Sequence, residues 1–393
     1  MPARISFAWA ALAFSILLFW QFLTVRCNWG GNWTALFCTG QAARLPAELQ
    51  TGTYRFPNSK GYDGQMYREV AHDPLMSRGF QAYVDAPRLR YRRILVPGLA
   101  FVLAGGQQSW IDECYIAVTG IFVLLGAYWL SRWAILNQLH AAWGLAFLLV
   151  PATLVSMDRM TVDGSLAALS VAFAYFLKTR STAKLYVVLA LACLARETGV
   201  LLVAACCISE LLIRRFAPAV LWGTACLPNL AWYWFLDTQV QMPAGSATPR
   251  WFLHKFGPGL IGRLFDPPRY PLSAPLEMIA RSADAIALSG MLGALILAVV
   301  LLRMRPAGAI PIAAGLYVAL AITLTAVQYW DSCYGYSRVF SPLLVLTALE
   351  TVASRRWSNA WLWALLPTSL VDTRIGLQLG PQIIGVLRGL LGH

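Results

Sequence analysis

An aspartate and a tyrosine spaced four residues apart stand in a polar segment, residues 60–74, of an otherwise apolar chain. On a helix, Asp63 and Tyr67 would share one face, and Gly64 would leave room beside the carboxylate. Such an aspartate can take a proton from an acceptor hydroxyl, and burial can raise its pKa towards the working range. The neighbouring side chains suit sugar hydroxyls and ring stacking: Tyr62, Gln65 and Tyr67. We interpret Asp63 as a catalytic base; the competing interpretation is a helix-start aspartate that favours the macrodipole.

An arginine cluster follows at residues 88–93. Guanidinium groups match phosphate geometry, so Arg92 and Arg93 are candidates for holding a lipid phosphate or pyrophosphate. The alternative for this cluster is attraction to anionic lipid headgroups. Further along the chain, Arg196 could face a phosphate, and Glu197 beside it suits a helix start.

Two other polar groups stand where apolar runs end. Asp158, Arg159 and Asp163 either orient a substrate or pair with one another as a polar cap. Tyr336 and Arg338 follow a later apolar run, where an aromatic belt is the ordinary explanation and anion binding by Arg338 is the alternative.

The composition shows which elements must position these residues. Of 393 residues, 58% are hydrophobic and 12% charged, against about 25% charged in a soluble domain. The net charge of +13 falls mainly in short basic clusters between apolar runs, which is typical of membrane topology signals rather than of a nucleic-acid-binding face. The sequence therefore predicts an all-α polytopic membrane protein with about ten transmembrane helices, several of them short.

With the N-terminus cytoplasmic, a single in–out order of the apolar runs places the short basic loops on the cytoplasmic side. It requires the apolar run at residues 94–106 to lie at the interface or re-enter, because a full crossing there would place the later basic turns outside. The prediction is a single transmembrane domain over residues 1–393, with a long outer loop at 26–110 that contains juxtamembrane helices. A second outer loop is expected at residues 237–283. Cys27 and Cys38 both fall on the outer side, and the sequence leaves undecided whether they form a disulfide there.

The order of these pieces resembles the membrane-embedded glycosyltransferases of the C-type fold, which include protein O-mannosyltransferases and lipid A aminoarabinose transferases. In this group an acidic residue in the first outer loop acts as base, and a juxtamembrane helix follows. The matching places are Tyr-Asp-Gly-Gln-Met-Tyr at 62–67, Tyr-Arg-Arg-Ile-Leu-Val-Pro at 91–97, residues 158–163 and Ala-Arg-Glu-Thr-Gly at 195–199. The first pattern is also similar to one in uncharacterised bacterial membrane proteins related to these enzymes. The chain departs from the family in lacking an Asp-Glu pair in the first loop and a large C-terminal outer domain.

The resemblance implies an inverting glycosyltransferase that moves a sugar from a polyprenyl-phosphate carrier to an outward-facing acceptor. The expected location is the bacterial inner membrane, with membrane lipids as partners, no nucleic acid, and the active site facing the periplasm or exterior. No cofactor is assigned, a divalent cation is left open, and the sequence does not indicate the oligomeric state. Two alternatives are a transporter or flippase of a lipid-linked anionic substrate and a catalytically inactive polysaccharide-assembly partner. The first is disfavoured because the sequence keeps its charges at the ends of the predicted spans.

Overall fold

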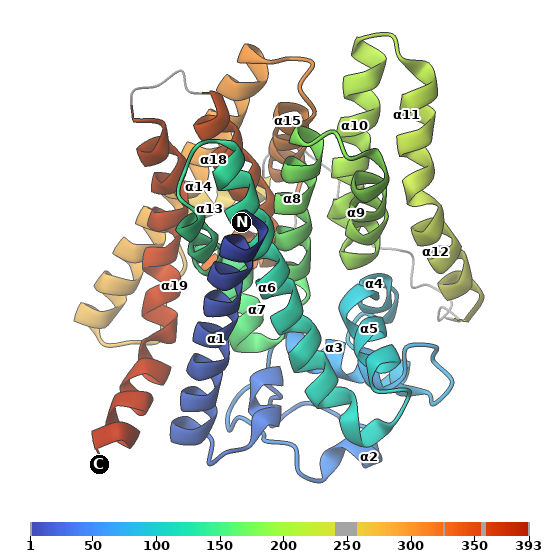
Figure 1. Cartoon of the computed structure of the whole chain (residues 1–393). Coiled ribbons are helices and arrows are strands. Elements are labelled where there is room, and N and C mark those ends of the chain that lie inside the picture. Colours follow the sequence, from blue (N-terminus) through green and yellow to red (C-terminus); the bar gives the residue numbers. More distant parts are fainter. Residues whose placement is uncertain (1, 240–257, 325–326, 355–358, 392–393) are drawn as a thin grey trace.

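The regular structure of the described residues is helical throughout. The computed structural model describes residues 2–239, 258–324, 327–354 and 359–391, so residues 240–257 of the second predicted outer loop lie outside the described residues. The long helices run side by side as a bundle, and the helices of the first predicted outer loop gather at its lower end in Figure 1. An all-α architecture is thus confirmed.

Three helices are long and apolar enough to cross a membrane, over Ala3–Asn28, Gln108–Leu136 and Ala274–Met304. They correspond to α1 (Pro2–Asn28), α6 (Ile111–Leu136) with the turn before it, and α14 (Ala274–Met304). A fourth span arises if the 3-10 helix η4 (Ala141–Leu149) and α7 (Pro151–Arg159), bent by 61° at their junction, count as one. The structure therefore supports a membrane protein with several apolar helices, while the number of about ten crossings stays a prediction.

The remaining helices of the bundle are shorter. Helix α8 (Asp163–Lys178) is buried along most of its length and packs against α6, α7, α9 and α18. Helices α9 (Thr182–Ala195) and α10 (Val200–Leu212) are joined by the short η5 (Glu197–Gly199). The other members of the bundle are α11 (Phe216–Gly223), η6 (Thr224–Cys226), α12 (Leu227–Gln239), α15 (Ala309–Thr323), α18 (Ser341–Ser354) and α19 (Ala360–Leu391).

The chain reverses sharply between α9 and α10. A Cβ atom added at Gly199 would lie 1.9 Å from the carbonyl oxygen of Ala192, so only glycine allows the two helices to meet this closely. Helices α9 and α10 thus form a hairpin. At 1.5 Å per residue, the 14 residues of α9 extend about 21 Å, less than the roughly 30 Å of a hydrocarbon core. The tip of this hairpin therefore stops short of a full crossing.

Short helices build the first predicted outer loop. They are η1 (Trp33–Phe37), α2 (Ala47–Gln50), α3 (Asp63–His72), η2 (Phe80–Ala82), α4 (Pro87–Arg92), α5 (Leu95–Leu103) and η3 (Gln108–Trp110). Helix α5 has nine residues, too few to cross a bilayer, and it packs on α3 and α6. This arrangement agrees with an interfacial helix at residues 94–106.

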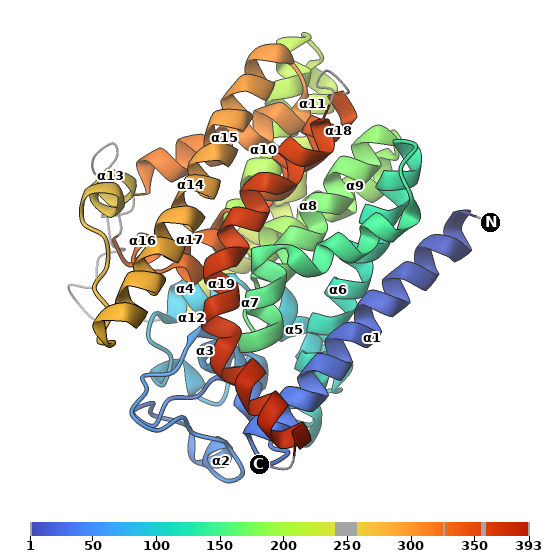
Figure 2. The same ribbon diagram turned by 90° about the vertical axis from the view of Figure 1, so that its left-hand side faces the viewer.

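A charged cluster inside the bundle departs from the sequence interpretation. Asp284 of α14 and Arg374 of α19 are both buried, and Arg374 Nε lies 3.2 Å from Asp284 Oδ1. The sequence predicts charges at the ends of spans. Helix α19 extends over Ala360–Leu391 and carries this arginine in its interior. Figure 2 shows α14 and α19 adjacent along much of their length.

Candidate functional site

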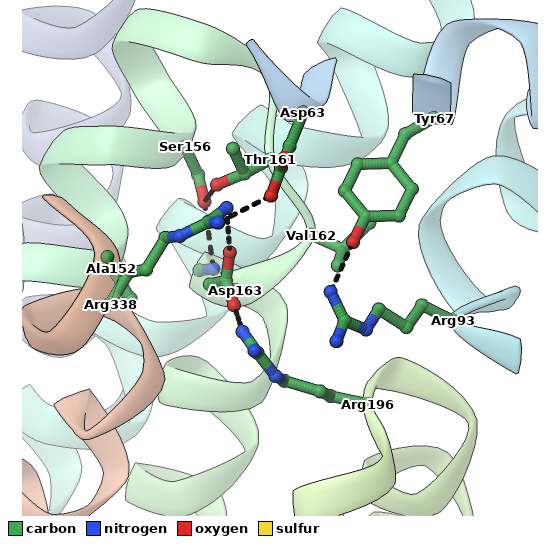
Figure 3. Close-up of polar contacts among 12 residues, drawn as sticks. Asp63, Tyr67, Arg93, Ala152, Ser156, Thr161, Val162, Asp163, Arg196 and Arg338 are labelled. Carbon is green, nitrogen blue, oxygen red and sulfur yellow. Dashed lines mark hydrogen bonds and ion pairs between the residues drawn. The ribbon is translucent and has the colours of Figure 1, made fainter. Parts of the chain in front are cut away.

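The polar clusters of the sequence converge on one place at the end of the central helix α8. Contributions come from α3, α4, the junction before α5, the first residue of α8, the α9–α10 turn and α17 (Cys333–Val339). Figure 3 shows the core of this cluster. Its members are Asp63, Tyr67, Arg90, Arg93, Asp163, Arg196, Glu197 and Arg338.

Asp63 is held by two arginines, one on each carboxylate oxygen. Arg90 Nη2 donates to Oδ1 at 2.9 Å, and Arg338 Nη2 donates to Oδ2. Burial alone would raise the pKa of Asp63, but the positive charges of Arg338 and Arg90 outweigh it and hold the pKa well below its usual range. The expectation that burial would raise this pKa is therefore wrong for the resting structure. Asp63 is an ionised carboxylate with both oxygens engaged.

Asp163 is the most deeply buried carboxylate of the site, with a side chain 1% exposed. Its Oδ1 pairs with Arg196, and its Oδ2 accepts from Arg338 Nη1 at 3.2 Å. Burial and the nearby Arg93 lower the pKa of Arg196 to about 10, so this arginine remains protonated at neutral pH. Arg338 thus bridges Asp63 and Asp163, the two carboxylates from distant parts of the chain.

Arg93 completes the other side of the site. Its Nε donates to Glu197 Oε2 at 2.8 Å, while Nη2 pairs with Oε1, which gives a two-pronged contact. Arg93 Nη1 donates to the Tyr67 hydroxyl at 2.6 Å, and Arg90 Nη1 reaches the same oxygen at 3.4 Å. Burial opposes ionisation of Glu197, but Arg93 and Arg196 lower its pKa to about 2.

These contacts close into a ring of acids, arginines and one tyrosine. Arg196 Nε lies 3.5 Å from Glu197 Oε1, which joins the two halves. The arginines are nearly enclosed, whereas the side chains of Asp63 and Glu197 are 18% and 34% exposed. The groups that an incoming molecule meets first are therefore carboxylates, with arginines directly behind them. We call this set of eight residues the charged ring.

The local sequence explains how α3 reaches the ring. A Cβ atom at position 64 would lie 2.1 Å from the carbonyl oxygen of Arg159, so Gly64 allows α3 to pack directly on the end of α7. Gln65 holds the preceding loop: its Oε1 accepts from Gly40 N and its Nε2 donates to Lys60 O, each at 3.0 Å. Both ends of this amide are thus engaged by the backbone.

A second group adjoins the charged ring. Arg159 Nε donates to Asp158 at 3.0 Å, and Gln382 Nε2 donates to the other oxygen of Asp158 at 2.7 Å. The guanidinium of Arg159 lies over the rings of Tyr62 and Tyr334, at 5.2 and 5.3 Å from their centroids. Because Arg338 also lies over Tyr62, at 5.1 Å, this tyrosine connects the two groups. Asp158 and Arg159 therefore pair with each other beside the ring.

Three candidates from the sequence lie outside these groups: Gln65, whose amide holds the preceding loop, Arg92 and Tyr336. Arg92 extends over the ring of Tyr233, at 4.7 Å, and Tyr336 is fully buried and stacks on Trp330. Arg90, which is not among the candidates from the sequence, takes the place expected of Arg92. Helical spacing could have found it, because residues 90 and 93 share a face of a helix, whereas 92 does not.

The cysteines near the site do not form the disulfide that the sequence left undecided. Cys27 and Cys38 are free thiols, and Cys38 Sγ accepts from Arg159 Nη1 at 3.3 Å. Within the described residues, no group of three or more histidine, cysteine, aspartate or glutamate side chains is arranged to hold a metal ion. The arginines are the cationic groups that this site offers to an anion.

Comparison with known proteins finds no family model, no curated protein and no solved structure that matches the chain.

Proposed function

We propose that the protein is a membrane-embedded glycosyltransferase that moves a sugar from a polyprenyl-phosphate carrier to an acceptor on the outer side of the membrane. The observation that carries the proposal is the charged ring, in which Asp63 is held by arginines from two separate segments, Arg90 and Arg338. A base next to several guanidinium groups is what this transfer needs, because the acceptor loses a proton while a phosphate leaves. The location in a bacterial inner membrane, with the ring facing outwards, belongs to the same proposal.

In this mechanism Asp63 accepts the proton of the acceptor hydroxyl. The acceptor oxygen attacks the anomeric carbon of the donor sugar from the side opposite the phosphate, and inversion results. The bond between that carbon and the phosphate oxygen breaks, and the electron pair stays on the phosphate. Arg338, Arg93 and Arg196 stabilise the phosphate as its charge grows, an effect on the order of a few kcal/mol.

The resting contacts require one exchange before this chemistry. Both oxygens of Asp63 are engaged by guanidinium groups, so the carboxylate is a poor base until one of them is withdrawn. Arg338 suits this exchange, since it already has a second carboxylate in Asp163 and its buried Nε has no hydrogen-bond partner among the described residues. A donor phosphate that draws Arg338 towards itself frees Oδ2 of Asp63 and raises its pKa.

The test compares Asp63→Asn with Asp85→Asn. Asp85 also pairs with Arg90, at 2.8 Å, but its side chain is 49% exposed, which makes it a matched control carboxylate. Purified protein is incubated with polyprenyl-phosphate-linked sugars and envelope acceptors, and products are followed by mass spectrometry. We expect Asp63→Asn to abolish transfer at unchanged expression and Asp85→Asn to retain it. Full transfer by Asp63→Asn would overturn the assignment.

A further inference from the structure

A second polar site lies apart from the charged ring. A cavity of about 560 Å³ opens between α13 (Pro258–Phe265), the turn that follows it and the end of α16 (Val327–Trp330). This volume falls within the range of roughly 300–1,000 Å³ that is usual for small-molecule sites. Gly262 faces open space on α13, and Trp330, whose ring edge lies against Gly259 of the same helix, also lines the cavity.

The base of this cavity is held in place by buried charges. Arg263 of α13 pairs with Asp284 of α14, Nη2 to Oδ1 at 3.2 Å, and both side chains are buried. Asp284 also accepts from Arg374 and from the Tyr270 hydroxyl. These contacts fasten α13 and the turn after it to α14 and α19. Arg263 is thereby neutralised, and it forms part of the wall rather than a free anion site.

Three further charged side chains line the cavity: Asp266, Arg269 and Asp331. They are exposed, and none of them forms a side-chain hydrogen bond or ion pair with another described residue. Counted with Arg263, Arg374 and their shared partner Asp284, the charges around the cavity balance. The exposed groups that a ligand meets are nevertheless two carboxylates and one guanidinium, which disfavours a phosphate dianion. They suit a ligand with many hydroxyl groups, which donate to carboxylates and accept from guanidinium, or a ligand that also carries an amine.

The outer face of α13 indicates where the ligand would come from. Ile261, Leu264 and Phe265 are exposed on this helix, while Arg263 points inwards, the pattern of a helix that lies in a membrane interface. The cavity would then sit at the membrane surface. Its ligand reaches it from the aqueous side or attached to a lipid headgroup.

One short helix connects the cavity to the charged ring. Trp330, in the cavity wall, stacks on Tyr336 of α17 with ring centroids 5.7 Å apart, and Arg338 follows two residues later. From residue 331 to residue 338 the helical rise is on the order of 10 Å. One short helix therefore separates the cavity from Arg338, which pairs with Asp63.

We propose that this cavity binds a neutral or amine-bearing sugar, and that it is the acceptor subsite of the transferase. The sugar-binding part stands on the cavity alone; the acceptor role rests on the proposed function. The acceptor is then a glycan, free or lipid-attached, rather than a polypeptide.

Saturation-transfer NMR on the purified full-length protein in detergent tests the proposal. The probes are the methyl glycosides of glucose, galactose, mannose, N-acetylglucosamine and glucosamine. We expect at least one to receive saturation from the protein, and binding to weaken about tenfold in Asp266→Asn and in Asp331→Asn, the loss typical of one charge-assisted hydrogen bond. Glu277→Gln is the matched control, because this carboxylate of α14 does not line the cavity. Its binding should equal that of the wild type.

The outcomes separate this inference from the proposed function. No saturation of any sugar, equal binding in the cavity variants and the control, or displacement of the sugar by inorganic phosphate would overturn the sugar site. If the wild-type protein transfers nothing, and both it and Asp63→Asn bind the sugar, the sugar site stands and the transferase proposal fails. Transfer to a glycan acceptor that is unchanged in both cavity variants would remove the acceptor role. Thermal unfolding of each variant checks that the fold is retained.

Discussion

Asp163→Asn should be among the most destabilising single changes in the charged ring. Asp163 is 1% exposed and is the shared partner of two buried arginines, Arg196 and Arg338. Removal of one partner from a buried ion pair typically costs about 3–5 kcal/mol, because the remaining charge is left uncompensated. Arg338 retains its ion pair with Asp63 in this variant. The loss of stability therefore comes chiefly from Arg196, whose remaining carboxylate partner is Glu197, with Nε 3.5 Å from Oε1.

The assay is thermal unfolding of the purified protein in detergent, with Asp85→Asn as the control. The exposed Asp85 should contribute about 0–1 kcal/mol, so the Tm of its variant should stay close to that of the wild type. The Tm of Asp163→Asn should fall by several degrees. A second variant, Asp163→Leu with Arg196→Met, should recover part of the loss, since an apolar pair of similar volume removes both buried charges. Equal Tm values for Asp163→Asn and Asp85→Asn would refute the assignment of Asp163 as the buried centre of the ring.

Two further predictions concern α3. Gly64→Ala should lower both Tm and transfer, because the new methyl group would overlap the carbonyl oxygen of Arg159, 2.1 Å from the Cβ position; a variant as stable as the wild type would show that α3 does not pack there. Glu69 is fully buried without a hydrogen-bond partner among the described residues, and burial, the largest influence, raises its pKa to about 9 against the effect of Arg68. Between its ordinary value of 4.5 and about 9 the folded protein keeps a proton that the unfolded chain releases, so stability falls as pH rises. Glu69→Gln should therefore raise Tm at pH 8 and have little effect at pH 5; the same change in Tm at both pH values would contradict this.

The sequence predicted those parts of the site that depend on neighbours along the chain. The spacing of Asp63 and Tyr67 implied one helical face, and α3 places both against Arg90. Glu197 was expected at a helix start, and η5 begins at this residue. These inferences use distances of a few residues, over which helical geometry is fixed.

Contacts between distant segments could not be read in the same way. Arg338 reaches Asp63 across 275 positions of sequence, and Arg374 reaches Asp284 across 90. The apolar pattern shows that the helices are buried but not which helices are neighbours, because many packings bury the same faces. The pKa of Asp63 was misjudged for this reason: its direction is set by two arginines whose proximity is a property of the whole bundle.

The charge balance of the ring has a consequence for the order of events. Arg90, Arg93, Arg196 and Arg338 face four carboxylates when Asp85 is included, so the resting site is close to neutral. If a neutral acceptor binds first, both carboxylate oxygens of Asp63 are still held by arginines, so no base is available to deprotonate it. If an anion binds first, it competes with the carboxylates for the same guanidinium groups. Each guanidinium that moves to the anion leaves its carboxylate near fewer positive charges, and the pKa of that carboxylate rises. If the ring performs the proposed transfer, the donor phosphate must bind before the acceptor is deprotonated, and the same arginines that suppress Asp63 at rest become the groups that stabilise the leaving phosphate.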